Sequence, residues 1–307
     1  MTRISTAGSY NHILSNILTA QERQNEAGQR TSTQKNGSDL KGYARNAEVL
    51  TAMKSIDGRL DHYTEQNKIV GFKLETQNLA LTQVSDAADS ARKAISEALA
   101  NNRADGLMSS LQTFFKSAAG GLNTKFDGKY LFAGAVADTA PLSAKELSDL
   151  SGGTTASFFQ NDTYIAQAKI DDNTTLTTGQ LADDIGTDLV AAFKSIQDFN
   201  GTAAGPFAGT LTDTQRIFLE NQLATWSSVS KNLVNSVAKN GSAQAQLDTT
   251  NAAITNQQTS VKTMLGDITD ANMAEAATQL SQAQIAVQAA SQTFISLQNS
   301  SLLNFLK

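Results

Sequence analysis

The chain has 307 residues, of which only 17% are charged and 6% aromatic, and its formal net charge is -5. It contains no cysteine, which excludes disulfide bonds and thiol chemistry, and its Lys and Arg residues are scattered singly, which argues against a nucleic-acid partner. No stretch approaches the roughly 18 apolar residues that cross a bilayer, and the first residues lack the apolar centre of a secretory signal, so we expect neither membrane insertion nor a cleaved leader.

An amphipathic helix is predicted at the start of the chain. The apolar residues of its stripe are Ile4, Tyr10, Ile13, Leu14, Ile17 and Leu18. From Gln21 to Glu48 large apolar residues are almost absent, while Gly28, Gly37 and Gly42 appear. We therefore expect this segment to be a flexible or extended spoke that leads to the next helix.

A long heptad pattern follows this segment. Both prolines, Pro141 and Pro206, lie in the middle of the chain, so the residues before about 127 and after about 210 are free to form continuous helix. From Val49, apolar residues recur at alternating steps of four and three for about seven heptads, which is typical of a coiled-coil-like helix. The seam consists of Val49, Met53, Ile56, Leu60, Tyr63, Asn67, Val70, Leu74, Gln77, Leu81, Val84, Ala88, Ala91, Ile95 and Ala98. Its polar members, Asn67 and Gln77, are of the kind that fixes register and partner.

The centre of the chain, residues 128–208, has a different composition. Turn signals such as Asp127-Gly128 and Gly152-Gly153 separate short segments with the composition of β-strands, including Phe158-Phe159, Tyr164 to Ile170 and Thr174 to Thr178. A short helix is predicted from Leu189 to Phe199. The centre is therefore expected to be a small mixed α/β insertion.

The second half repeats the helical design. Its seam consists of Leu219, Leu223, Trp226, Ser230, Leu233, Val237, Asn240, Gln244, Leu247, Asn251, Ile254, Gln258, Val261, Leu265 and Ile268. Because this seam is more polar than the first, we expect the helix to need the first one as an antiparallel partner. Trp226 falls on the seam, so core packing is the favoured interpretation over ligand stacking.

A further helix is predicted after Gly266, with its own heptads. Its seam alternates large residues with alanine: Met273, Ala276, Leu280, Ala283, Val287, Ala290, Phe294 and Leu297. The final segment from Leu302 to Leu306 is also apolar, and such a surface is typically buried by a partner.

These elements predict a mainly α protein: a long antiparallel coiled-coil-like helical bundle with terminal helices and a small mixed α/β central insertion. We divide it into residues 1–45 with 266–307 (terminal assembly helices and spoke), 46–127 with 209–265 (long helical bundle) and 128–208 (central variable domain).

No catalytic or metal-binding constellation stands out in the sequence. His12 and His62 each lack a second histidine at metal-ligand spacing, and the pairs Asp171-Asp172 and Asp183-Asp184 do not follow the pattern of a calcium loop. Solvated turns explain the acidic pairs more simply. We therefore expect no enzyme activity, no cofactor and no metal, with a ligand- or sugar-binding module in the centre as a minor alternative.

Short motifs at both ends and at the start of the centre resemble the bacterial flagellin family. These are Arg3-Ile4-Ser5-Thr6 with Tyr10, the segment Gln29 to Asn36 with Ser38-Asp39, the segment Gly128 to Gly134 continuing to Asp138-Thr139-Ala140-Pro141, and the run from Asp270 to Leu306. The family usually has glycine where this chain has Gln34, and Asp-Pro where it has Leu40-Lys41. The "YLFAG" stretch from Tyr130 to Gly134 is most similar to the hook-associated members that connect hook to filament.

The resemblance implies a function and a mechanism. Such a chain would be a structural subunit of the flagellum, exported unfolded by the flagellar type III route and placed outside the cell at the hook-filament junction; a filament-forming flagellin is the alternative. Its implied partners are other copies of itself, neighbouring hook-associated and flagellin subunits, and a flagellar export chaperone.

The apolar rows of the terminal helices would order when neighbouring subunits cover them. The residues assigned to this assembly interface are Ile4, Ile13, Ile17, Leu280, Val287, Phe294 and Leu297.

Overall fold

The computed structural model describes the backbone of residues 2–303 and the side chains of residue 8 and residues 11–298. Its elements in chain order are α1 (Thr2–Thr33), η1 (Leu40–Tyr43), α2 (Ala47–Asn101), α3 (Leu107–Leu122), β1 (Lys125–Phe126), β2 (Lys129–Tyr130), η2 (Leu147–Leu150), η3 (Thr155–Phe158), β3 (Gln167–Lys169), β4 (Thr175–Thr177), α4 (Ala182–Asn200), α5 (Asp213–Thr269) and α6 (Met273–Leu303), where η marks a 3-10 helix. The predicted fold class, mainly α with a small mixed insertion, is confirmed.

The chain forms two compact units. One comprises Met1–Asp61 with Asn256–Lys307, and the other comprises His62–Thr255. The division into three parts that we predicted from composition stays a prediction.

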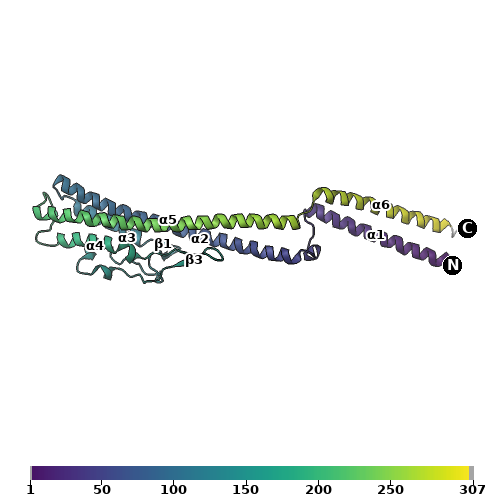
Figure 1. Ribbon diagram of the computed structural model, residues 1–307, viewed down its shortest axis with the longest axis horizontal. Helices are drawn as coiled ribbons and strands as arrows, with labels where there is room; N and C mark the ends of the chain where they lie inside the picture. Colours follow the sequence, from purple (N-terminus) through teal and green to yellow (C-terminus); the bar gives the residue numbers. More distant parts are fainter. Residues whose placement is uncertain (1, 304–307) are drawn as a thin grey trace. The chain divides into compact units, whose positions relative to one another are not determined.

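In the first unit, α1 and α6 lie side by side and antiparallel, with the start of α1 and the end of α6 at the same end of the pair (Figure 1). Among the side chains described, the buried positions of these two helices are all alanines: Ala20, Ala27, Ala276 and Ala283. Small side chains at the contact allow two helix backbones to approach closely. The predicted heptads of α6 are therefore used within the chain, against α1.

The spoke predicted for residues 21–48 is mostly helix instead, because α1 continues to Thr33. The helical part of this segment is rich in Gln, Glu and Arg, which favour helices even when large apolar residues are lacking, and Ala27 keeps it packed on α6. The connection proper begins at Gln34, whose φ of 58° ends the helix. It is then fixed to the end of α5, since the Asn36 amide donates to the carbonyl oxygens of Ile268 (3.2 Å) and Asp270 (2.9 Å).

Two helix boundaries also differ from the prediction. The front helix is interrupted before Pro141, because Asn102 (φ 52°) and Gly106 (φ 77°) turn the chain between α2 and α3. Asn and Gly accept the left-handed region at little cost, so a break does not need proline. At the other boundary Gly266 lies inside α5, and α6 begins after Asn272, whose side-chain oxygen accepts the amide N–H of Ala274 at 3.1 Å.

In the second unit, α2 and α5 pair antiparallel as predicted. The Asn67 amide donates to the side-chain oxygen of Asn251 (2.8 Å), and the Ser230 hydroxyl donates to Asp89 (2.8 Å) further along. Most of the predicted seam of α2 is buried from Leu60 to Ala98, whereas Val49 is exposed and Leu50 is buried in its place.

Helices α3 and α4 complete the core of this unit. Phe193 of α4 makes edge-on ring contacts with Phe115 of α3 (5.3 Å between centroids) and with Trp226 of α5 (4.8 Å). All three side chains are fully buried. The core-packing role predicted for Trp226 is confirmed, and the predicted short helix is present as the longer α4.

The strands of the centre form two small antiparallel hairpins, β1–β2 and β3–β4. Ile170 and Leu176 of the second hairpin pack with Val70, Leu74 and Leu247 of the long helices. Phe158, which we expected in a strand, lies in η3 instead.

Candidate assembly surface

The α1/α6 pair carries the residues that the sequence analysis assigned to assembly. Ile13 and Ile17 of α1 and Leu280, Val287, Phe294 and Leu297 of α6 are all half-buried. They share the heptad rows of the four buried alanines, so the structure brings both sets onto the contact between the two helices. The side chain of Ile4 lies outside the described residues. Whether neighbouring subunits cover these residues stays a prediction.

Large and small residues in these rows differ in burial. The alanines are almost inaccessible, whereas the larger side chains reach past the helix contact and keep part of their surface in water. Two helices alone cannot enclose a Leu or Phe placed at the edge of their contact. Each such side chain would gain about 25 cal/mol for every Å² that a further partner removed from water.

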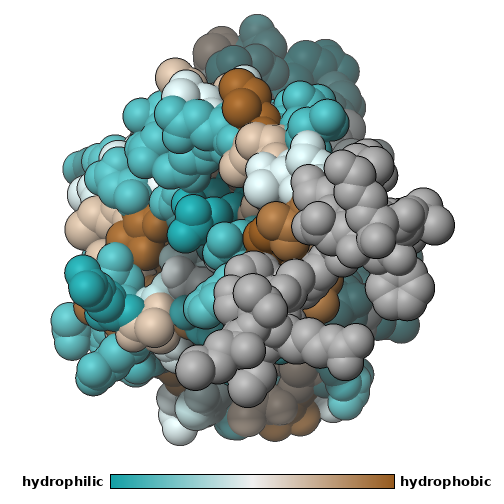
Figure 2. Space-filling view, turned by 90° about the vertical axis from the view of Figure 1, so that its right-hand side faces the viewer, coloured by the Kyte–Doolittle hydropathy of each residue, from teal (hydrophilic) through white to brown (hydrophobic). Residues whose placement is uncertain are grey.

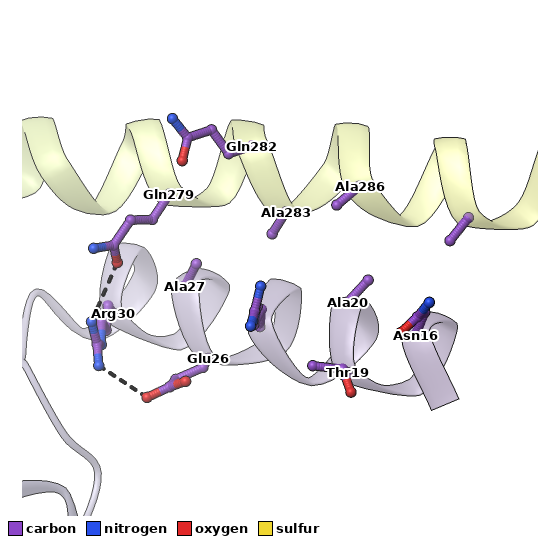
Figure 3. A pocket seen from close by; sticks show the side chains of 12 residues that line it. Asn16, Thr19, Ala20, Glu26, Ala27, Arg30, Gln279, Gln282, Ala283 and Ala286 are labelled. Atoms are coloured by element: carbon purple, nitrogen blue, oxygen red, sulfur yellow. Dashed lines mark hydrogen bonds and ion pairs between the residues drawn. The ribbon is translucent and has the colours of Figure 1, made fainter. Parts of the chain in front are cut away.

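A groove of about 560 Å³ runs along the contact between α1 and α6. Figure 3 shows Ala20 and Ala27 of α1 facing Ala283 and Ala286 of α6 across this space. The alanine methyl groups that line this space leave it unfilled.

Polar side chains line one end of the groove. Arg30 donates to Glu26 at 2.9 Å and to Gln279 at 3.3 Å (Figure 3), so it connects the two helices. Its Nε is buried without a hydrogen-bond partner within the described part of the chain. The Arg30–Glu26 pair lies within α1 and is largely solvent-exposed, so it contributes at most about 1 kcal/mol and serves to hold the Arg30 side chain near Gln279 of α6.

Other apolar residues of the pair point away from the groove and into solvent. Leu18 is 57% exposed on α1 and Ile285 is 63% exposed on α6, with Leu14 and Ile295 close to half exposed. In the view of Figure 2, the visible hydrophobic residues (brown) lie in small patches among hydrophilic ones (teal). Ile285 and Ile295 were not among the predicted residues, because both fall outside the α6 heptad row. A large apolar residue off that row was the signal that could have revealed them.

The residues that the structure describes contain no group of three or more His, Asp or Glu side chains arranged to hold a metal ion. Within the same residues, no helix is long and apolar enough to cross a membrane.

Comparison with known proteins identifies part of the chain. Residues 226–306 match the bacterial flagellin C-terminal helical region, which here covers α6 and most of α5. No protein of curated function has a significantly similar sequence.

Solved structures of flagellar proteins share the fold. A structure described as a flagellar hook-associated protein from Vibrio parahaemolyticus is 15% identical with a TM-score of 0.59, covering 73% of this chain and 97% of its own. FlgL from Bacillus cereus is 14% identical with a TM-score of 0.55, covering 71% of this chain and 99% of its own. FlgL from Xanthomonas campestris is 12% identical with a TM-score of 0.53, with coverages of 71% and 99%. The chain thus shares the fold of these solved structures, and its residues 226–306 are similar to the C-terminal helical region of bacterial flagellins.

Proposed function

We propose that this protein is a structural, non-enzymatic subunit of the bacterial flagellum that connects the hook to the filament. The observation that carries the proposal is the coincidence of two features in α6. This helix lies within the match to the flagellin C-terminal region, and it also bears the half-buried row Leu280, Val287 and Phe294.

The α1/α6 pair is incomplete by itself. Its fully buried positions are alanines, which contribute little apolar area, while Leu14, Leu18, Ile285 and Ile295 face water. Packing against neighbouring copies would bury these side chains and fill the groove. Apolar helices of this kind are typically ordered by their partners, which couples folding to assembly.

The partners follow from this role. We propose contacts with other copies of the chain and with adjacent hook-associated and flagellin subunits in an extracellular assembly. Type III export and a cytoplasmic chaperone that shields α6 belong to the same proposal, because an unassembled apolar helix needs protection before it reaches its neighbours.

A filament-forming flagellin is the second candidate, and the match to the flagellin C-terminal region favours it as much as the first. The similarity in fold to hook-associated proteins, with almost their whole length covered, supports the junction role instead. The two candidates differ in whether the subunit forms a short ring or extends its own lattice.

Immunogold electron microscopy of intact flagella separates these candidates, using an antibody against residues 128–208. Label in one band at the far end of the hook is the result that we expect. Label along the whole filament would indicate a flagellin. Flagella without any label, from cells in which the protein is expressed and the epitope is accessible to the antibody, would contradict both candidates.

A further inference from the structure

A second cavity lies within the unit His62–Thr255. It encloses about 260 Å³ between α2, the β1–β2 hairpin and the segments around residues 134, 164 and 179. Lys73 lines it from α2, with Tyr130 and Gln180 among the residues on the other sides. A volume of this size accommodates one side chain or a small organic ligand.

The walls of this cavity are held in place by backbone constraints. Gly179 approaches Ala166 so closely that a Cβ atom at this position would come within 2.4 Å of the Ala166 nitrogen. Gly134 has a φ of +70°, and next to it Asp162 accepts the amide N–H groups of Ala135 and Tyr164, each at 3.0 Å. The cavity is therefore preformed by turns that only glycine allows at two of its corners.

The charged residues that line the cavity are Lys73, Lys129 and Asp127. Lys129, which also lines it, forms an ion pair with Asp138 at 2.6 Å. In the part of the chain that the structure describes, no carboxylate lies within ion-pair distance of the Lys73 amine, and burial lowers the pKa of this amine. A partly desolvated cation without a partner is stabilised by any anion that reaches it. Asp127 also lines the cavity and repels any anion, but it repels a singly charged carboxylate less than a doubly charged anion such as phosphate.

The surroundings of the cavity are apolar as well. Val136, Tyr164 and Ile165 are the large hydrophobic residues exposed within residues 128–208 of the described chain, and Tyr164 is 57% exposed. Tyr164 lines the cavity, and the other two are chain neighbours of lining residues. Exposed apolar residues gathered around one cavity are characteristic of a protein contact.

We propose that this cavity binds the carboxylate of an acidic side chain on a partner polypeptide. Lys73 forms the ion pair, while Val136, Tyr164 and Ile165 pack against the apolar residues that flank the acidic one. Because its chemistry does not depend on the flagellar role, failure of this inference would leave the proposed function unaffected.

Fluorine NMR of the full chain labelled with 3-fluorotyrosine tests the proposal. The chain has five tyrosines, and the Tyr164 signal is assigned with Tyr164→Phe. Titration with acetyl-Leu-Glu-Val-amide is expected to shift this signal saturably, with a Kd of about 1–10 mM, as for a single small contact. The matched peptide acetyl-Leu-Gln-Val-amide should bind at least ~10-fold more weakly, because it lacks the charge.

Variants of the protein separate Lys73 from general charge. Lys73→Met should weaken binding of the acidic peptide by ~10-fold or more, and Lys73→Arg should retain most of it. Lys231→Met makes the same change in net charge on the exposed surface of α5 and should leave the Kd unaltered.

Three outcomes would overturn the proposal. They are equal binding of the Glu and Gln peptides, no effect of Lys73→Met, and no saturable shift of the Tyr164 signal. Sodium acetate or inorganic phosphate binding as tightly as the acidic peptide would indicate a site for free anions, and would likewise overturn the assignment to a polypeptide.

Discussion

The α1/α6 pair and the helices of the second unit use the same heptad spacing but reach different degrees of burial. In α1 and α6 the buried side chains are alanines, and every described Ile, Leu, Val or Phe keeps some exposed surface. In the second unit α3 and α4 add a layer to α2 and α5, so that Phe115, Phe193 and Trp226 are enclosed.

This difference shows that heptad spacing does not determine whether a helix pair is stable by itself. Two helices cover one stripe of each other, while further helices or further subunits must cover the rest. The second unit supplies that layer from its own chain. The α1/α6 pair has only the groove and its exposed apolar residues, so its stability should depend on assembly.

The largest effect should come from a core substitution in the second unit. Phe193→Ala removes a fully buried ring that contacts Phe115 and Trp226, and should lower the free energy of unfolding by about 3–5 kcal/mol. Urea unfolding followed by circular dichroism measures this change. Leu79→Ala, at a position that is 67% exposed, is the control and should change it by less than about 0.5 kcal/mol.

A charge in the heptad row of α6 should act on assembly instead. Phe294→Asp places a carboxylate on a half-buried position and should cost about 1–3 kcal/mol per subunit contact, or roughly a 10–100-fold rise in critical concentration. Sedimentation of assembled protein measures this rise. Gln298→Asp adds the same charge at an exposed position of the same helix. Assembly impaired equally by both variants, or by neither, would argue against the interface.

Two alanines of α6 should respond differently to enlargement. Ala276→Leu overfills a buried position against α1 and should destabilise the pair by about 1–3 kcal/mol. Ala286→Leu extends into the open groove and should change its stability by less than about 0.5 kcal/mol. Amide hydrogen exchange of α6 in the unassembled protein compares the two variants. An equal increase in the exchange rate for both variants would mean that the groove is closed in solution.

The smallest effect should be electrostatic. The hydrogen bond from Lys35, followed by that from Thr269, lowers the pKa of Asp270. A carboxyl group with a lowered folded-state pKa adds stability above its unfolded pKa of about 3.9, and this stability is lost as the pH falls through the folded value. Lys35→Gln should raise the Asp270 pKa toward its ordinary value in a carbon NMR titration, and an unchanged pKa would exclude Lys35 as the main cause.

Residue periodicity made the long helices, their antiparallel pairing and the core position of Trp226 predictable. It failed where small residues carry the packing, as in the segment from Gln21 to Thr33, which we expected to be a spoke because it lacks large side chains. It also missed the break at Asn102 and Gly106, since backbone conformation at single residues leaves little trace in hydrophobic spacing.

Contacts between distant segments were outside the reach of pattern analysis. Asn67 was predicted to fix the register of the seam, and the structure shows that its amide also donates to the Ile170 carbonyl at 2.9 Å, attaching the β3–β4 hairpin to α2. In the candidate site, the row from Ile13 to Leu297 was predictable from heptads. The groove was not, because it depends on how closely two alanine-lined helices approach.

Hydrogen exchange of the free and the assembled protein, compared segment by segment, tests the central claim most directly. We expect residues 62–255 to be protected in both forms, because their core is complete within the chain. Helices α1 and α6 should be only weakly protected in the free protein and strongly protected after assembly. Equal protection of α1 and α6 in the two forms would contradict the claim that the pair needs its neighbours.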